Sequence, residues 1–303
     1  MSQQIYDGLL NLTGEKQVRC GEPLKPHTTF RVGGPADYFV TVNTVKELSD
    51  VTSFLREAEI PFFILGNGSN LLVSDEGYRG AVLTLGGEFK SISVNGEYIT
   101  AGAGVMLSEV CTTARDNGLT GLEFAYGIPG TVGGAMVMNA GAYGGEMVNV
   151  VESVSLLLPG GELKDYSTSQ MQFGYRDSVI KHAELYVCST VFKLSFGEKE
   201  RIAATMQEII GKRRDKQPLE FPSAGSTFKR PEGYFAGKLI QDAGLSGRRV
   251  GGAAVSTKHC GFVVNDANAT ASDINELMNE VTDEVYKAFG VRLEPEVIRI
   301  GSF

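Results

Sequence analysis

The 303-residue chain contains no tryptophan, three histidines, four cysteines and no long apolar run. The cysteines are far apart and form no CxxC pair, so we expect free thiols in a reducing compartment rather than a disulfide framework or a metal site. No apolar stretch approaches the roughly 20 residues that cross a bilayer. The first residues lack the basic and apolar regions of a signal peptide. We therefore expect a cytoplasmic protein with no membrane partner.

Positive charge is also scarce. Lys and Arg number 28 against 36 Asp and Glu, which gives a formal net charge of −8. A nucleic-acid-binding protein needs a basic surface to neutralise phosphates, so we expect no nucleic-acid partner. A local basic pocket for one anionic small molecule remains compatible with this balance.

The length predicts two domains, at roughly 150 residues each. Strands and helices alternate in the first half, and residues 195–199 resemble a linker, which places a boundary near residue 197. Thr44 and Glu47 form a capping box that opens a helix reaching about Ala58. Further helices are expected from Met106 to Gly118, around residues 202–214, and from Ser272 to Phe289. Strands are expected at residues 36–41, 62–65, 81–85, 91–94, 98–101, 153–158, 162–166, 186–194 and 261–265.

Two glycine-rich loops dominate the first half. Residues 66–70 read Gly-Asn-Gly-Ser-Asn, and residues 127–134 contain four glycines in eight positions. Glycine allows positive φ and close backbone approach, so successive N–H groups can point at one phosphate. Neither loop has the GxGxxG or GxxxxGK[ST] pattern, which disfavours a Rossmann or P-loop site. Two tight turns in a β-rich domain are the alternative interpretation.

Seven sequence blocks in register resemble the UDP-N-acetylenolpyruvoylglucosamine reductase family, from about residue 20 to the C-terminus. The blocks include Thr-Phe-Arg-Val-Gly-Gly from Thr29, Tyr-Arg-Asp-Ser from Tyr175, and Ala-Gly-Ser-Thr-Phe-Lys from Ala224. The others are residues 66–70, residues 121–134, residues 138–144 and Leu-Glu-Pro-Glu-Val from Leu293.

The resemblance implies an α+β fold with a vanillyl-alcohol-oxidase/PCMH-type FAD-binding domain in residues 1–197. Its subdomains are expected at about residues 1–63 and 64–197, and an α+β substrate-binding domain at residues 198–303. It also implies non-covalent FAD, NADPH as reductant, no metal, and reduction of UDP-N-acetylglucosamine enolpyruvate to UDP-N-acetylmuramate in peptidoglycan precursor synthesis. The residues expected to contact FAD are Gly66, Asn67, Gly68, Ser69, Asn70, Gly127, Ile128, Pro129, Gly130, Thr131, Gly133, Gly134, Asn139 and Gly141.

The same resemblance assigns catalytic roles to Arg176, Ser226 and Glu296. Hydride addition to the terminal vinyl carbon leaves negative charge on the carbon beside the carboxylate, and that charge must be stabilised and protonated. Arg176 can grip the carboxylate bidentately. Glu296 helps only if it is protonated when substrate is bound, as a carboxyl beside another carboxylate tends to be. Ser226 matches the proton donor of the family.

The nucleotide-sugar diphosphate calls for cations and donors, and we expect them among Tyr175, Arg213, Lys216, Lys229 and His259. The chain departs from the family at two of its blocks. Arg230 stands where many members have asparagine, and Ile298 separates Glu296–Val297 from Arg299 where many members have Glu-Val-Arg. The stretch from Val187 to Ser226 is too short for the inserted substrate-covering loop of one subtype, which indicates the shorter subtype.

Two other interpretations remain open at the level of sequence. One is an oxidase on the same fold with covalently attached flavin, but none of the histidines lies inside the two glycine loops. The other is a non-catalytic protein that binds a flavin or a nucleotide sugar.

Overall fold

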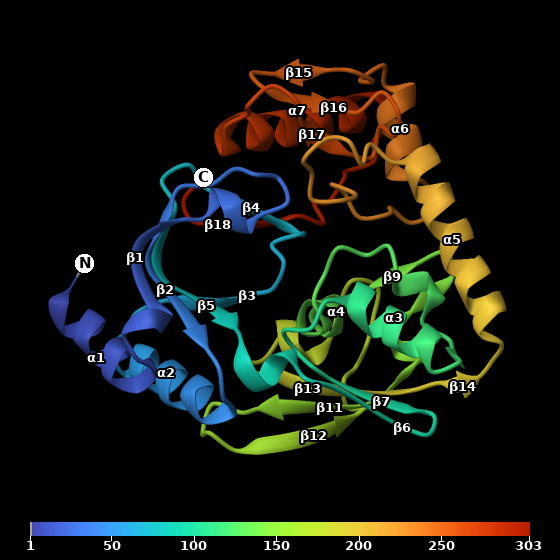
Figure 1. Ribbon diagram of the computed structural model, residues 1–303. Helices are drawn as coiled ribbons and strands as arrows, with labels where there is room; N and C mark the ends of the chain where they lie inside the picture. The colour runs from blue at the N-terminus through green and yellow to red at the C-terminus, as the bar shows by residue number, and fades with distance from the viewer. Residues whose placement is uncertain (1) are drawn as a thin grey trace. The chain divides into compact units, whose positions relative to one another are not determined.

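The computed structural model describes residues 2–303, which divide into two compact units that are each discontinuous in sequence (Figure 1). Unit 1 comprises residues 1–20, 38–67 and 80–212, of which Met1 is not described, and unit 2 comprises residues 21–37, 68–79 and 213–303. The predicted domain boundary near residue 197 divides the chain into two continuous parts, unlike these discontinuous units. That boundary stays a prediction.

The first part of unit 1 pairs two helices with a four-stranded sheet of order β1-β2-β5-β3, in which β3 and β5 run parallel. The strands β1, β2 and β5 extend past the boundaries of the unit. Apolar side chains from both helices pack on this sheet, among them Leu9, Leu48 and Leu55. The elements are α1 Gln3–Thr13, α2 Val45–Glu57, β1 Val18–Pro23, β2 Pro35–Val42, β3 Phe62–Leu65 and β5 Tyr78–Leu85.

The rest of unit 1 contains an antiparallel sheet of order β12-β11-β13-β7-β6, packed against α3 and α4. The elements are β6 Ile92–Asn95, β7 Tyr98–Gly102, α3 Leu107–Asp116, α4 Val132–Met138, β11 Val151–Leu157, β12 Leu163–Ser167 and β13 Tyr186–Lys193. Two short pairs complete it, β9 Gly141–Ala142 with β10 Gly145–Glu146, and β8 Leu119–Thr120 with β14 Ser195–Phe196. The linker expected at residues 195–199 is therefore wrong for Ser195 and Phe196, which form β14, and for Lys199, which begins a helix.

Unit 2 is built around α7, which lies against a three-stranded antiparallel sheet of order β15-β16-β17 (Figure 1). A second pair, β4 with β18, is parallel. The elements are β4 Leu71–Val73, α6 Ala236–Asp242, β15 Arg249–Val250, β16 Ala253–Val255, β17 Val263–Asn265, α7 Ala271–Phe289 and β18 Ile298–Ile300. Helix α5, Lys199–Lys216, begins in unit 1 and ends in unit 2.

Local signals explain which helices were predictable. The Thr44 side chain caps α2 by accepting from Glu47 N–H, although Glu47 itself accepts from Asn43 N–H rather than closing the box. Helix α7 begins at Ala271, one residue before the expected Ser272, because Thr270 and Asp273 form a full capping box. The apolar residues Ile274, Leu277, Met278, Val281 and Val285 form its core-facing stripe and are fully buried.

Helix α4 was not predicted as a helix, because Gly133 and Gly134 are poor helix formers. Thr131 caps it by accepting from Gly134 N–H. Within the described residues, no helix is both long and apolar enough to cross a membrane, and no group of three or more His, Cys, Asp and Glu side chains is arranged to hold a metal ion.

Candidate functional site

A cavity of about 800 Å³ lies within unit 1, along β3 and beside the start of α4 and of β13. Its walls are mostly apolar, with Ile60, Phe62 and Leu65 from the β3 region, and they include Gly66 and Thr131 from the two glycine loops. Its volume is typical of a site for a ligand of cofactor size.

The two glycine loops meet at one end of this cavity. A Cβ atom on Gly66 would lie 2.7 Å from Thr131 Oγ1, so a larger residue there would push the loops apart. Asn67 Nδ2 donates to Pro129 O at 2.8 Å, which ties the first loop to the second. Gly133 N–H donates to Ala103 O at 2.8 Å and fixes the turn into α4.

The donor chemistry of the first glycine loop fits the pyrophosphate of FAD. Within the part of the chain that the structure describes, the N–H groups of Asn67, Gly68 and Ser69 make no hydrogen bond to the protein. Gly68 has a φ of +59°, and a Cβ there would meet His27 O at 2.1 Å, so only glycine fits the turn. Unpaired backbone N–H groups in a tight glycine turn are suited to an anionic phosphate oxygen.

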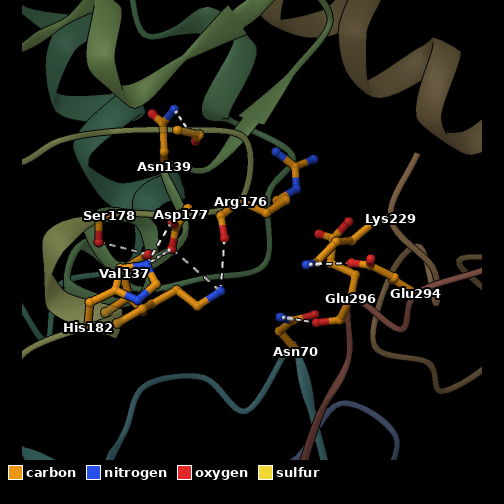
Figure 2. A network of polar contacts seen from close by, with 12 residues as sticks. Asn70, Val137, Asn139, Arg176, Asp177, Ser178, His182, Lys229, Glu294 and Glu296 are labelled. Atoms are coloured by element: carbon orange, nitrogen blue, oxygen red, sulfur yellow. Dashed lines mark hydrogen bonds and ion pairs between the residues drawn. The ribbon is translucent and has the colours of Figure 1, made fainter. Parts of the chain in front are cut away.

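Arg176 lies on a tight turn in unit 1 whose ends are both anchored (Figure 2). Its φ is +55°, a conformation that costs energy for an arginine and often occurs at functional sites. Before the turn, Asn139 Nδ2 donates to Gly174 O at 3.0 Å, and after it, Ser178 Oγ donates to Val137 O at 2.9 Å. The guanidinium donates to Gly141 O at 3.3 Å and stacks over the Tyr175 ring at 5.2 Å.

Asn139 is buried and in a left-handed conformation, with a φ of +40°, at the end of α4. Besides the bond to Gly174, its Nδ2 donates to Glu146 Oε2 at 2.9 Å and its Oδ1 accepts from Val148 N–H at 3.0 Å. These bonds hold the Arg176 turn against the β9–β10 hairpin. Contact of Asn139 or Gly141 with the cofactor stays a prediction.

In unit 2, Thr227 anchors the segment that carries Ser226. Thr227 N–H donates to Gly261 O at 2.8 Å, its Oγ1 accepts from Val263 N–H at 2.8 Å, and its carbonyl accepts from Glu296 N–H at 2.8 Å. Ser226 itself is exposed beside this buried anchor. The structure thus brings the predicted Ser226 and Glu296 onto neighbouring chain segments, although they are 70 residues apart in sequence.

Further bonds tie the surroundings of Glu296 together (Figure 2). Asn70 Nδ2 donates to Glu296 O at 3.1 Å, and Lys229 N–H donates to Glu294 O at 2.8 Å. The Lys229 ammonium lies 3.1 Å from Glu294 Oε2 in a partly exposed ion pair. Of the other predicted substrate-binding residues in unit 2, Arg213 and Lys216 lie in the last turn of α5.

His259 is half-buried against the edge of the Phe262 ring, with centroids 5.1 Å apart. Burial lowers its pKa. Its Nδ1 accepts from Gly261 N–H at 3.1 Å, which requires the proton of the neutral ring to sit on Nε2. His259 can therefore offer a neutral Nε2–H donor to a ligand rather than a positive charge.

Most of the cavity wall was missed from the sequence. Lining residues such as Arg56, Lys90 and Glu184 belong to segments that read as ordinary helix ends and turns. The apolar strand at residues 62–65 was predicted, but which edge it occupies depends on pairing with β5. No local sequence pattern specifies that β3 pairs with β5.

Comparison with known proteins covers nearly the whole chain. Residues 36–167 match the family described as FAD binding domain, and residues 217–300 match UDP-N-acetylenolpyruvoylglucosamine reductase, C-terminal domain. The chain is 47% identical over 305 residues to UDP-N-acetylenolpyruvoylglucosamine reductase of Lachnoclostridium phytofermentans, covering 99% of this chain and 98% of the relative. It is 47% identical over 300 residues to the enzyme of the same name from Clostridioides difficile, covering 99% of each.

Among solved structures, the chain resembles UDP-N-acetylenolpyruvylglucosamine reductase from Thermus caldophilus. The TM-score is 0.81 at 38% identity, covering 94% of this chain and 98% of the other. The similarity therefore extends over both compact units.

Proposed function

Because the chain belongs to the UDP-N-acetylenolpyruvoylglucosamine reductase family, we propose that Arg176, Ser226 and Glu296 are its catalytic residues. The protein is an FAD-dependent oxidoreductase with the α+β fold and vanillyl-alcohol-oxidase/PCMH-type FAD-binding domain expected from its sequence. It reduces UDP-N-acetylglucosamine enolpyruvate to UDP-N-acetylmuramate in peptidoglycan precursor synthesis, with NADPH as reductant.

In the proposed FAD site, the close approach of Gly66 and Thr131 brings the two glycine loops together. The unpaired N–H groups of Asn67, Gly68 and Ser69 then hold the pyrophosphate. When bound, FAD supplies the hydride-transfer chemistry between NADPH and substrate. We propose that it is held without a covalent bond. In support, neither of the two glycine loops contains a histidine or a cysteine that could attach the flavin. The other residues predicted to contact FAD, residues 127–130 with Asn70, Gly133, Gly134, Asn139 and Gly141, remain part of the proposal.

Arg176 and Glu296 would bind the substrate carboxylate in different ways. Arg176 presents a permanent cation with two parallel N–H donors, from a backbone turn that is fixed at both ends. Glu296, protonated when substrate is bound, would donate a hydrogen bond to the other carboxylate oxygen. Both interactions become stronger as negative charge develops beside the carboxylate during the reaction.

Ser226 would donate its Oγ proton to the carbon that bears this charge. A carbanion stabilised only by the neighbouring carboxylate is a strong enough base to take a proton from a hydroxyl group. The observation that carries the proposal is the anchoring of Thr227, whose carbonyl accepts from Glu296 N–H at 2.8 Å. This bond fixes the backbone of the proton donor relative to that of the carboxylate-binding residue.

The substrate contacts, the domain limits and the cellular location are also proposals. Tyr175, Arg213, Lys216, Lys229 and His259 would contact the nucleotide sugar, with the cations neutralising its diphosphate. Residues 1–197 would bind FAD, in subdomains divided near residue 63, and residues 198–303 would bind substrate. We place the protein in the cytoplasm, without nucleic-acid or membrane partners, in agreement with its four free thiols and net charge of −8.

Arg176→Lys tests the proposed binding of the substrate carboxylate. Lysine keeps the positive charge but cannot form two parallel hydrogen bonds to the carboxylate, so kcat/KM for the enolpyruvyl substrate should fall on the order of 10². Product would be quantified by mass spectrometry in the presence of NADPH. Arg115→Lys is the matched control, because Arg115 forms an exposed ion pair with Asp116 in α3. Equal activity of the two variants would remove Arg176 from the catalytic set.

A further inference from the structure

A three-residue polar network borders the FAD cavity at a distance in sequence from both glycine loops. Arg56 at the end of α2 donates through Nε and Nη2 to Glu184 Oε1, at 3.0 Å and 2.7 Å. The Tyr186 hydroxyl donates to the same oxygen at 2.6 Å. All three side chains line the cavity, and all belong to unit 1.

The bonding of Glu184 is one-sided. Its Oε1 accepts all three hydrogen bonds, whereas among the described residues nothing donates to Oε2. The hydrogen bonds from Arg56 and Tyr186 lower the pKa of Glu184, so the side chain is a carboxylate at neutral pH. Arg56 Nη1 also donates to Pro159 O at 3.1 Å, which fixes the guanidinium in the turn before β12. An oriented acceptor is thus available at the cavity wall.

The position of the network decides which part of FAD can reach it. FAD has its pyrophosphate in the middle, so one half of the molecule extends each way from the glycine loops. The cavity runs from Gly66 along β3 to Ile60 and Arg56, and Arg176 is not among the residues that line it. The flavin ring has to reach the reacting substrate, so the half that enters this cavity is the adenosine half.

The walls also suit an adenosine. The rings of Phe62 on β3 and Tyr186 on β13 lie 6.0 Å apart and both line the cavity, which offers aromatic surface to a purine. Adenosine carries hydrogen-bond donors on its amino group and its ribose, and a free carboxylate oxygen accepts such donors strongly.

We propose that Glu184, held by Arg56 and Tyr186, accepts a hydrogen bond from the adenosine half of FAD and makes the site selective for FAD over FMN. FMN lacks that half and gains nothing from Glu184. The inference rests on the FAD site of the proposed function and adds to it the residue that recognises the far end of the cofactor.

Glu184→Gln is the sharpest test. The amide oxygen of the glutamine keeps the hydrogen bonds from Arg56, so its NH₂ group takes the place of Oε2. That NH₂ group then faces the hydrogen-bond donor of the adenosine half, and no hydrogen bond can form. The dissociation constant of FAD should rise about tenfold or more, the expected loss for a hydrogen bond to a charged group. It would be measured on the holoenzyme by dilution, from the flavin fluorescence that appears on release. The FMN/FAD ratio bound after dialysis against equal concentrations should rise by the same factor.

Two further variants complete the test. Tyr186→Phe keeps the ring, removes one bond to Glu184 and should act in the same direction with a smaller effect. Glu208→Gln changes a carboxylate in an exposed ion pair on α5, outside the cavity, and should leave the FAD affinity unchanged. An unchanged FAD affinity in Glu184→Gln, or an equal loss in Glu208→Gln, would overturn the proposal. Because no substrate is present, neither result bears on Arg176 or Ser226.

Discussion

At the scale of single residues, the site depends on side chains whose chemical state is set by their neighbours. Glu184 stays ionised because donors surround one of its oxygens, and the neutral form of His259 is favoured because the ring is half-buried and its Nδ1 accepts from a backbone N–H. The same reasoning applies to Glu296, whose proposed role requires a proton when the substrate carboxylate is beside it.

Glu296→Gln and Glu296→Asp separate donation from charge. Glutamine keeps the length and offers an N–H donor, whereas aspartate falls short of the carboxylate. We expect the Asp variant to lose on the order of 10² in kcat/KM and the Gln variant to lose less. Steady-state rates with saturating NADPH would show the order. A more active Asp variant would contradict the protonated role of Glu296.

His259 should make the fold sensitive to acid. Its folded pKa lies below the ordinary value of 6.5, so the unfolded chain binds the proton more readily. The contribution of neutral His259 to the free energy of unfolding is complete above about pH 6.5 and is lost as the pH falls from there through the folded pKa. The free energy of unfolding from urea titrations should therefore fall less steeply between pH 7 and pH 5 in His259→Gln than in the unmodified protein. Parallel slopes would assign the acid sensitivity to other groups.

At the scale of elements, short segments with little local signal are stabilised by side chains from elsewhere. Helix α4 contains two glycines and ends in a left-handed Asn139, whose side chain bonds the β9–β10 hairpin and the Arg176 turn. The sequence block containing Asn139 was recognised, yet its contact to Gly174, 35 residues later, depends on tertiary packing. The same holds for Thr227, which reads as one residue of a turn and in fact joins three segments.

Asn139→Gly tests this structural role, because glycine keeps the left-handed backbone and removes only the side chain. Three partly buried hydrogen bonds are lost, at about 1–3 kcal/mol for each group left unsatisfied. We expect the melting temperature to fall by several degrees, measured by calorimetry. Asn117→Gly is the control, since that exposed side chain makes one local bond to Thr113 O. An equal shift in both variants would mean that the contacts of Asn139 contribute no special stability.

At the scale of the whole molecule, the family, the fold class and the segments that hold the three proposed catalytic residues could be predicted from the sequence. Those features lie in contiguous blocks, such as residues 224–229 and 293–297. The discontinuous units and the cavity wall could not be predicted, because they depend on pairing between distant strands. Residues 21–37 and 68–79, for example, belong to unit 2 although they are surrounded in sequence by unit 1.

The central claim is that Ser226 protonates the substrate carbon, and Ser226→Ala tests it most directly when the two half-reactions are followed separately. NADPH oxidation by the variant needs no protein acid, so the flavin absorbance should be lost at the normal rate on mixing in stopped flow. Return of the absorbance on anaerobic addition of the enolpyruvyl substrate should slow on the order of 10² or more, as expected for removal of a general acid. Ser195→Ala, on the short strand β14, should be normal in both phases. If absorbance returned in Ser226→Ala at the normal rate, another group would have to supply the proton and the assignment would be wrong.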